Sequence, residues 1–197
     1  MSVDEVVVAM RALERAFLIG VEGVTEVWLV RHGDVYAQLD EPEDPPLSSL
    51  GRAQASRLAA RLRQVKIDAV YASPLRRALE TARAFHEEPQ IDARLIEVQA
   101  DFTGGRVQVM EAPDQVVARM QASVRDAVAA HPGERIVMVG HGLAILNYLC
   151  AVLRLEPGSL RLYPGYTSIS VVRMKDGQAM AGSLFDVAHL EGLGSAS

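Results

Sequence analysis

Apolar and polar positions follow each other along this chain in blocks typical of strands alternating with helices. The apolar runs predict strands over 25–30, 68–72, part of 91–97, 135–140, 167–174 and 178–185. Between them, apolar residues recur every three or four positions and predict helices over 3–19, 48–65, 73–85, 113–130 and 143–155. This order predicts an α/β sandwich around a mainly parallel sheet. The last two strands form a hairpin around Asp176-Gly177, so one edge strand should be antiparallel.

Three helix starts carry their own signals. Ser48 is a candidate N-cap for the second predicted helix. Ser73-Pro74 predicts the start of the third, with serine as the cap and proline in the first helical position. Pro113 opens the fourth, and His131-Pro132-Gly133 ends it.

The predicted first helix, over 3–19, precedes the first strand and is amphipathic. Its apolar positions include Val3, Met10 and Phe17 at helical spacing. The simplest expectation is that this face packs on its own domain. A homodimer contact or a surface for another partner remains an open alternative.

Length and composition change this picture little. The 197 residues, 49% of them apolar, contain no internal repeat and no linker, so 1–197 is expected to form a single domain. A net charge of −5 argues against non-specific nucleic-acid binding. Cys150 is the single cysteine, which excludes an internal disulfide and a thiolate-rich metal site.

The chain carries no apolar run of about 20 residues that could span a membrane. Asp4 and Glu5 lie where a secretory signal would be basic and then apolar. We therefore expect a cytoplasmic protein without a membrane partner.

Polar residues follow three of the predicted strands at the same end. The first strand runs into Arg31-His32, the second leads to a helix whose first turn holds Arg77, and a third ends in His141. Because the carboxyl ends of parallel strands share one edge of a sheet, these side chains should converge. Two helix N-termini would lie beside them and favour an anion. The arrangement predicts a pocket for a phosphoryl group.

The residue types also indicate a chemistry for this pocket. A neutral imidazole is a competent nucleophile near pH 7, and arginine binds two phosphoryl oxygens at once. The leaving group of a phosphate ester needs a proton, so a carboxylic acid is expected at the mouth of the pocket. Glu97 is the leading candidate. Weaker candidates are Asp34, Asp101 and Glu111.

Five blocks occur in this order: Arg31-His32-Gly33, then 46–51 (PLSSLG), 73–78 (SPLRRA) with Thr81-Ala82, 95–97 (LIE) and 139–142 (VGHG). With this set the chain resembles the histidine phosphatase superfamily, the phosphoglycerate-mutase-like phosphatases. The resemblance spans 25 to about 174. It implies a three-layer α/β/α sandwich and a reaction that requires neither a metal nor another cofactor.

The resemblance also implies individual roles. His32 would become phosphohistidine, Glu97 would act as general acid and base, and the phosphoryl oxygens would be bound by Arg31, Arg77 and His141. Gln38 stands where the family often has an asparagine, which makes it a further candidate phosphate contact. The chain departs from the family pattern after Glu97, where 98–105 lacks the usual glycine-aromatic-glutamate-glycine stretch.

Together these observations predict a cofactor-independent phosphomonoesterase acting on a small phosphomonoester. A phosphoglycerate-type mutase and a catalytically idle phospho-ligand binding module are the alternatives. The acidic loop 35–46 is either a solvated surface or a border of the site that disfavours highly anionic substrates. The sequence does not identify the physiological substrate.

Overall fold

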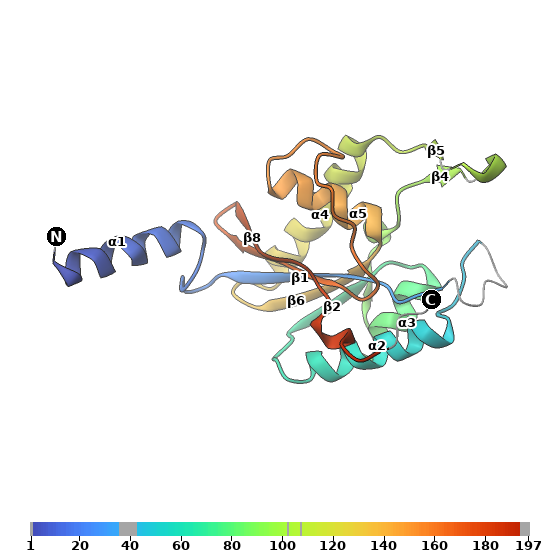
Figure 1. The fold of residues 1–197 in the computed structure, drawn as a ribbon, viewed down its shortest axis with the longest axis horizontal. Coiled ribbons are helices and arrows are strands. Elements are labelled where there is room, and N and C mark those ends of the chain that lie inside the picture. The colour runs from blue at the N-terminus through green and yellow to red at the C-terminus, as the bar shows by residue number, and fades with distance from the viewer. Residues whose placement is uncertain (1, 36–42, 102, 107, 194–197) are drawn as a thin grey trace.

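The structure is a computed structural model that describes residues 2–35, 43–101, 103–106 and 108–193. Its centre is a six-stranded sheet, with α4 and α5 on one face and α2 and α3 on the other (Figure 1). This is the α/β/α sandwich that the sequence predicts. No helix within the described ranges is long and apolar enough to cross a membrane.

The helices and strands have the following bounds. The α-helices are α1 (Val3–Ala16), α2 (Ser49–Leu62), α3 (Arg76–Arg83), α4 (Pro113–Ala130) and α5 (Gly142–Val152). The strands are β1 (Thr25–Arg31), β2 (Ala69–Ala72), β3 (Gln90–Ile91), β4 (Ala100–Asp101), β5 (Gln108–Val109), β6 (Arg135–Gly140), β7 (Ile169–Lys175) and β8 (Gln178–Asp186). Short 3₁₀ turns cover Ala93–Leu95, Thr103–Gly105 and Ala188–Leu190.

The sheet has the strand order β3-β2-β6-β1-β7-β8. β1 pairs in parallel with β6, and β6 in parallel with β2, so the carboxyl ends of these three strands lie at one edge. β7 runs antiparallel to β1, and β8 returns beside it to complete the sheet. The mainly parallel sheet is therefore confirmed, with the antiparallel hairpin at one side.

Alternating side chains of the central strands form two cores. From β1, Val27 and Leu29 face α4 and α5, whereas Val30 faces α2 and α3. On β6, Ile136 faces α4 and α5, and Val137 faces α2 and α3. Because both faces of these strands are covered, they read in the sequence as nearly continuous apolar runs.

Two of the predicted helix starts are confirmed. The hydroxyl of Ser48 accepts a hydrogen bond of 3.0 Å from the backbone N–H of Gly51, so it caps α2. Pro113 is the first residue of α4. At the predicted hairpin turn, Asp176 and Gly177 both have positive φ, as a two-residue turn between twisted strands requires.

The predicted start of α3 at Ser73-Pro74 is wrong. α3 begins at Arg76, and its N-cap residue Leu75 has no side-chain cap. The carboxylate of Asp44, from the acidic loop, accepts hydrogen bonds of 3.0 and 3.1 Å from the backbone N–H of Arg76 and supplies the missing cap. Ser73 instead extends the pairing of β2, donating its N–H to the carbonyl of Val139.

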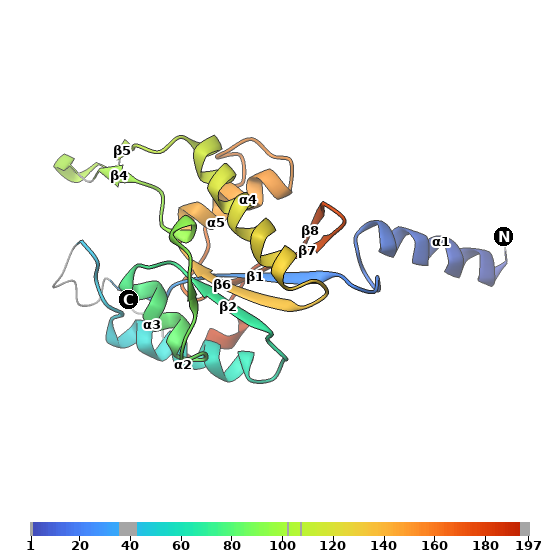
Figure 2. The same ribbon diagram turned by 180° about the vertical axis from the view of Figure 1, so that it is seen from behind.

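The expected packing of the first helix on its own domain is also wrong. α1 has a capping box formed by Ser2 and Glu5, but none of its residues is buried. It projects from the body at the end of the sheet where β1 begins (Figures 1 and 2). Its apolar face is therefore exposed in the single chain.

The segment 91–97 is less regular than predicted. Only Gln90–Ile91 pairs with β2, and the following Ala93–Leu95 forms a 3₁₀ turn that leads directly to Glu97. The stretch after Glu97 forms the small β4–β5 hairpin, which projects from the body (Figure 1).

Candidate active site

His32 follows β1 at the carboxyl edge of the sheet and is only 5% exposed. Its Nδ1 lies 2.7 Å from the carbonyl oxygen of Gly33. Because a carbonyl oxygen only accepts hydrogen bonds, Nδ1 carries the proton, and Nε2 holds the lone pair. Burial, with smaller contributions from Arg77 and Arg31, lowers the pKa of His32 to about 3. The imidazole is therefore neutral at physiological pH and has an unprotonated Nε2.

Arg77 approaches that nitrogen from the first turn of α3. Its Nε donates a hydrogen bond of 3.3 Å to Nε2 of His32. The guanidinium also pairs with Asp44 over 3.6 Å. The acidic loop thus borders the site through Asp44, which is the reading that the sequence left as an alternative.

His141 enters the site as the N-cap residue of α5 and is fully buried. The ring centroids of His141 and His32 are 5.1 Å apart. Nε2 of His141 shares a hydrogen bond of 2.8 Å with the hydroxyl of Ser73. Within the described part of the chain, its buried Nδ1 has no hydrogen-bond partner. Burial, and then the neighbouring His32, hold the pKa of His141 well below its usual value.

Arg31 is the last residue of β1, and two tyrosines hold its guanidinium. The carbon Cζ lies 3.9 Å from the ring centroid of Tyr166 and 4.9 Å from that of Tyr163, within the range of cation–π interactions. Nη1 donates a hydrogen bond of 2.7 Å to the carbonyl of Pro164. The segment 163–166 therefore orients this arginine, a role that the sequence did not reveal.

Glu97 lies at the N-terminus of α5, the helix that His141 caps. Its Oε1 accepts hydrogen bonds from the N–H groups of Val98 at 2.8 Å and Ala144 at 3.0 Å. Its Oε2 accepts another from Leu143 at 3.3 Å. The carboxylate is therefore fixed beside the first turn of α5. That turn directly follows His141 in the chain.

The three weaker acid candidates are placed differently. Glu111 forms a two-point ion pair with Arg119, and these hydrogen bonds hold its pKa below the usual value. Asp101 lies in the exposed β4–β5 hairpin. Asp34 is buried beside His32, with its N–H bonded to Gln54 and its carbonyl to Ser48. Of the four acids, Glu97 is the one that accepts hydrogen bonds from the first turn of α5 in the contacts described above.

Arg119, on α4, supports the segment that carries Glu97. Its Nη1 donates hydrogen bonds to the carbonyl oxygens of Arg94 at 2.7 Å and Ile96 at 2.8 Å. The pairing with Glu111 fixes the other side of the guanidinium. No local sequence signal marks this residue, because the carbonyls that it binds lie more than twenty positions away.

The loop after His32 is held by close packing and by Thr81. A Cβ on Gly33 would lie 2.8 Å from the carbonyl oxygen of Gly51, so the two glycines permit the loop to approach α2. The hydroxyl of Thr81 accepts a hydrogen bond from the N–H of Gly33 and donates one to the carbonyl of Arg77. Thr81 therefore links the loop after His32 to α3, the helix that carries Arg77.

The structure brings His32, His141, Arg31 and Arg77 together at the carboxyl edge of the sheet, as the sequence predicts. Gln38 lies outside the described residues. Among the residues described, no group of three histidine, cysteine or acidic side chains could hold a metal ion. Two neutral imidazoles, two guanidinium groups and the N-terminus of α5 form a site suited to a compact, multiply charged anion.

Comparison with known families agrees with this geometry. The model of the histidine phosphatase superfamily (branch 1) matches residues 27–108 and 98–186, most of the chain. The chain belongs to the histidine phosphatase superfamily. The resemblance that the motifs indicate is thereby confirmed.

Curated relatives within this superfamily carry two kinds of name. A probable phosphoglycerate mutase, GpmB of Enterobacter sp. (strain 638), is 25% identical over 84% of this chain and 95% of its own length. The metal-independent phosphoserine phosphatase of Arabidopsis thaliana is 26% identical over 87% of this chain and 85% of its own length. The relatives thus include both phosphatases and mutase-like proteins.

Solved structures of other proteins share the fold. The phosphoserine phosphatase of Entamoeba histolytica, solved with phosphoserine, superposes with a TM-score of 0.72 at 20% identity, over 84% of this chain and 99% of that one. Bacillus stearothermophilus YhfR gives a TM-score of 0.71 at 25% identity, over 85% and 100% of the two chains. The sheet and its covering helices are therefore arranged as in these solved structures.

Proposed function

We propose that this histidine phosphatase superfamily member is a cofactor-independent phosphomonoesterase that acts through a phosphohistidine on His32. The tautomer of His32 is the observation that carries the proposal. The bond from Nδ1 to Gly33 directs the lone pair of Nε2 toward the cluster of cationic side chains. A nucleophile with this orientation and a low pKa needs no separate base to remove a proton.

In the first step, Nε2 of His32 attacks phosphorus in line with the ester oxygen. The N–P bond forms, the P–O bond breaks, and Glu97 donates its proton to the departing alkoxide. Arg77 exchanges its bond to Nε2 for one to a phosphoryl oxygen. Arg31 and Nδ1 of His141 bind the remaining charge, since that nitrogen has no other partner among the described residues.

In the second step, Glu97, now a carboxylate, removes a proton from water. The resulting hydroxide attacks phosphorus, the N–P bond breaks, and the lone pair returns to His32 as inorganic phosphate leaves. Glu97 is protonated again and ready for the next ester. Each atom and proton is accounted for without a metal or an organic cofactor.

Rapid-quench labelling tests this proposal. Enzyme mixed with a ³²P-labelled phosphomonoester and quenched in alkaline detergent, which preserves phosphohistidine, should carry label on His32. His32→Asn should abolish the label and reduce turnover by about 1000-fold or more. His86→Asn, which changes an exposed histidine, is the matched control. Full turnover by the His32 variant would exclude the mechanism.

Mutase activity is the second candidate, because several relatives are named phosphoglycerate mutases. A mutase returns the phosphoryl group to the bound product, so 2- and 3-phosphoglycerate would interconvert faster than phosphate is released. We propose hydrolysis as the main reaction and a small phosphate ester as the substrate. A panel with phosphoserine, phosphoglycerates, sugar phosphates and nucleotides identifies the class. Binding of phosphate analogues without turnover of any ester would indicate an idle binding module.

A further inference from the structure

The apolar face of α1 is uncovered in the single chain. The helix has 14 residues and none of them is buried. Helices of this length are marginally stable in water unless an apolar face is packed. Both ribbon views show α1 projecting from the body rather than lying on it.

The apolar positions of α1 form a seam suited to another helix. Val3, Val6, Met10, Leu13 and Phe17 follow one another at alternating steps of three and four residues, which is the repeat of a coiled coil. Each is at least 39% exposed. Ala9 and Ala16 flank the seam and would let a second helix approach closely, whereas Asp4, Arg11 and Arg15 lie on the other side.

The charges along α1 favour an antiparallel partner of the same sequence. The first turn carries Asp4 and Glu5, and Arg15 is the basic residue of the last turn. Two parallel copies would place acidic turn beside acidic turn. Two antiparallel copies instead place the acidic first turn of each helix near the base of the other and oppose their helix dipoles, although these charged side chains lie outside the apolar seam. Such a pair has its centre at Met10, with Val3 of one copy against Phe17 of the other.

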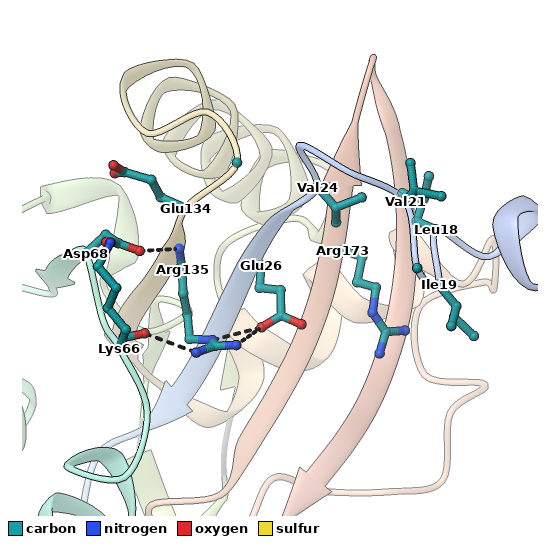
Figure 3. A pocket seen from close by; sticks show the side chains of 12 residues that line it. Leu18, Ile19, Val21, Val24, Glu26, Lys66, Asp68, Glu134, Arg135 and Arg173 are labelled. Atoms are coloured by element: carbon teal, nitrogen blue, oxygen red, sulfur yellow. Dashed lines mark hydrogen bonds and ion pairs between the residues drawn. The ribbon is translucent and has the colours of Figure 1, made fainter.

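A cleft lies at the base of α1, where the end of an antiparallel second helix would lie, and three acidic and three basic residues line it. It has a volume of about 510 Å³, with Leu18, Ile19 and Val21 on its apolar wall (Figure 3). On its polar side, Arg135 binds Glu26, and Lys66 pairs with Asp68. Arg173 also lines the cleft but makes no hydrogen bond or ion pair with any residue that the structure describes.

We propose that two copies of this chain dimerise through antiparallel packing of α1. The acidic first turn of each helix then reaches the base of the other, beside Phe17 and Ile19 at the cleft that contains Arg173. The partner is a second copy because the seam, the charge order and the cleft complement one another within one sequence. The His32 sites lie at the opposite edge of the two sheets and take no part in the contact.

Paired variants on the two sides of the helix test the interface. Leu13→Asp places a charge in the seam, whereas Val8→Asp places the same charge on the outer side, at a position that is 69% exposed. By sedimentation equilibrium, the wild type and Val8→Asp should have the mass of two chains. Leu13→Asp should dissociate about 100-fold more readily while keeping wild-type phosphatase turnover. A monomeric wild type at all concentrations would overturn the proposal.

Cysteine substitutions test the orientation, since the native Cys150 is buried. Met10→Cys should form an intermolecular disulfide under mild oxidation, because Met10 faces its own copy. Val3→Cys alone should not, whereas the double variant Val3→Cys, Phe17→Cys should. Cross-linking of Val3→Cys alone would show a parallel pair and overturn the antiparallel arrangement.

A charge exchange tests the role of the cleft, and lipid vesicles test whether a membrane surface covers α1 instead. Arg173→Glu should weaken dimerisation by about tenfold, and adding Asp4→Arg should restore it. Equal affinity in all three proteins would remove the cleft from the proposal.

Phosphatidylcholine–phosphatidylglycerol vesicles should not bind the dimer. A monomer that binds these vesicles through α1 would show a membrane-surface helix and overturn the dimer.

Discussion

Nε of Arg77 donates a hydrogen bond to Nε2 of His32 over 3.3 Å, so the guanidinium covers the nitrogen that is proposed to attack phosphorus. The same guanidinium is within 3.6 Å of Asp44. An entering phosphate competes with both contacts. Arg77 therefore contacts both the proposed nucleophile and the acidic loop, and the predictions below concern these neighbours.

The first prediction concerns the dependence of stability on pH. The pKa of His32 is about 3 in the folded protein and about 6.5 in the unfolded chain. Below pH 6.5 His32 binds a proton in the unfolded state but not in the folded state. The free energy of unfolding therefore falls as the pH drops toward 3. Between pH 6.5 and 4.5, His32 alone should account for about 2 kcal/mol.

Urea denaturation at several pH values measures this effect. His32→Asn should reduce the slope of the unfolding free energy against pH, on the acid side, by the amount that one proton contributes. The contribution of His141 should remain. His86→Asn, which removes an exposed imidazole, provides the comparison. Identical slopes in the wild type and His32→Asn would show that His32 titrates alike in the folded and unfolded states.

The second prediction concerns Glu97 as the proton donor. Glu97→Gln keeps an oxygen that can accept bonds from the N–H groups of α5 but cannot donate the acidic proton. Hydrolysis of alkyl phosphates should fall by about 100- to 10,000-fold, because their alkoxides leave poorly. Hydrolysis of p-nitrophenyl phosphate should fall much less, because its leaving group needs no proton.

Asp101→Asn is the matched control for Glu97, since it removes a nearby exposed carboxylate from the same loop. It should affect both substrates little. If Asp101→Asn or Glu111→Gln produced the leaving-group dependence and Glu97→Gln did not, the acid would be assigned to the wrong residue.

The third prediction assigns Arg119 a positioning role. Arg119→Met removes the bonds to the carbonyls of Arg94 and Ile96 and leaves Glu111 without its partner. Unfolding free energy should fall by about 3 kcal/mol, and activity should fall with the leaving-group dependence of the Glu97 variant. Adding Glu111→Gln should recover stability but not activity. Recovery of both would show that Arg119 acts only on stability.

The fourth prediction concerns the acidic border of the site. Asp44→Asn keeps an oxygen acceptor for the N–H of Arg76 but removes the charge beside Arg77. Without this charge a second phosphate is repelled less, so KM for bisphosphates should fall by about fivefold, which corresponds to about 1 kcal/mol. The change should shrink in high salt. Glu43→Gln, which changes the neighbouring exposed acid, should leave KM unchanged. An equal fall in KM for this variant would indicate that the overall negative charge of the loop, and not Asp44 itself, repels the substrate.

The parts of the site that the sequence predicts are those that depend on strand order. His32 and His141 each follow an apolar run, and parallel pairing of β1 with β6 necessarily brings the ends of these strands together. Ser48 is likewise predictable, because its hydroxyl binds an N–H three residues away. Such relationships are local or follow from the topology.

The wrong expectations depend on residues far apart in the chain. Ser73 has the sequence signature of a helix cap, but its hydroxyl binds His141, and Asp44 caps α3 from 32 positions upstream. The contacts of Arg119 with Arg94 and Ile96 are invisible for the same reason. The amphipathic pattern of α1 predicts an apolar face correctly but contains no information on whether that face is covered by its own domain.

The clamp of Tyr163, Tyr166 and Pro164 around Arg31 also bears on product release. A guanidinium that is already fixed loses little conformational entropy when an anion binds, so more of the contact energy is realised as affinity. Inorganic phosphate, the product of the proposed hydrolysis, would present the same oxygens to Arg31 as the ester does. If the proposed reaction holds, a rigid Arg31 should strengthen competitive inhibition by phosphate, and loosening the clamp should lower the affinity for phosphate and speed its release.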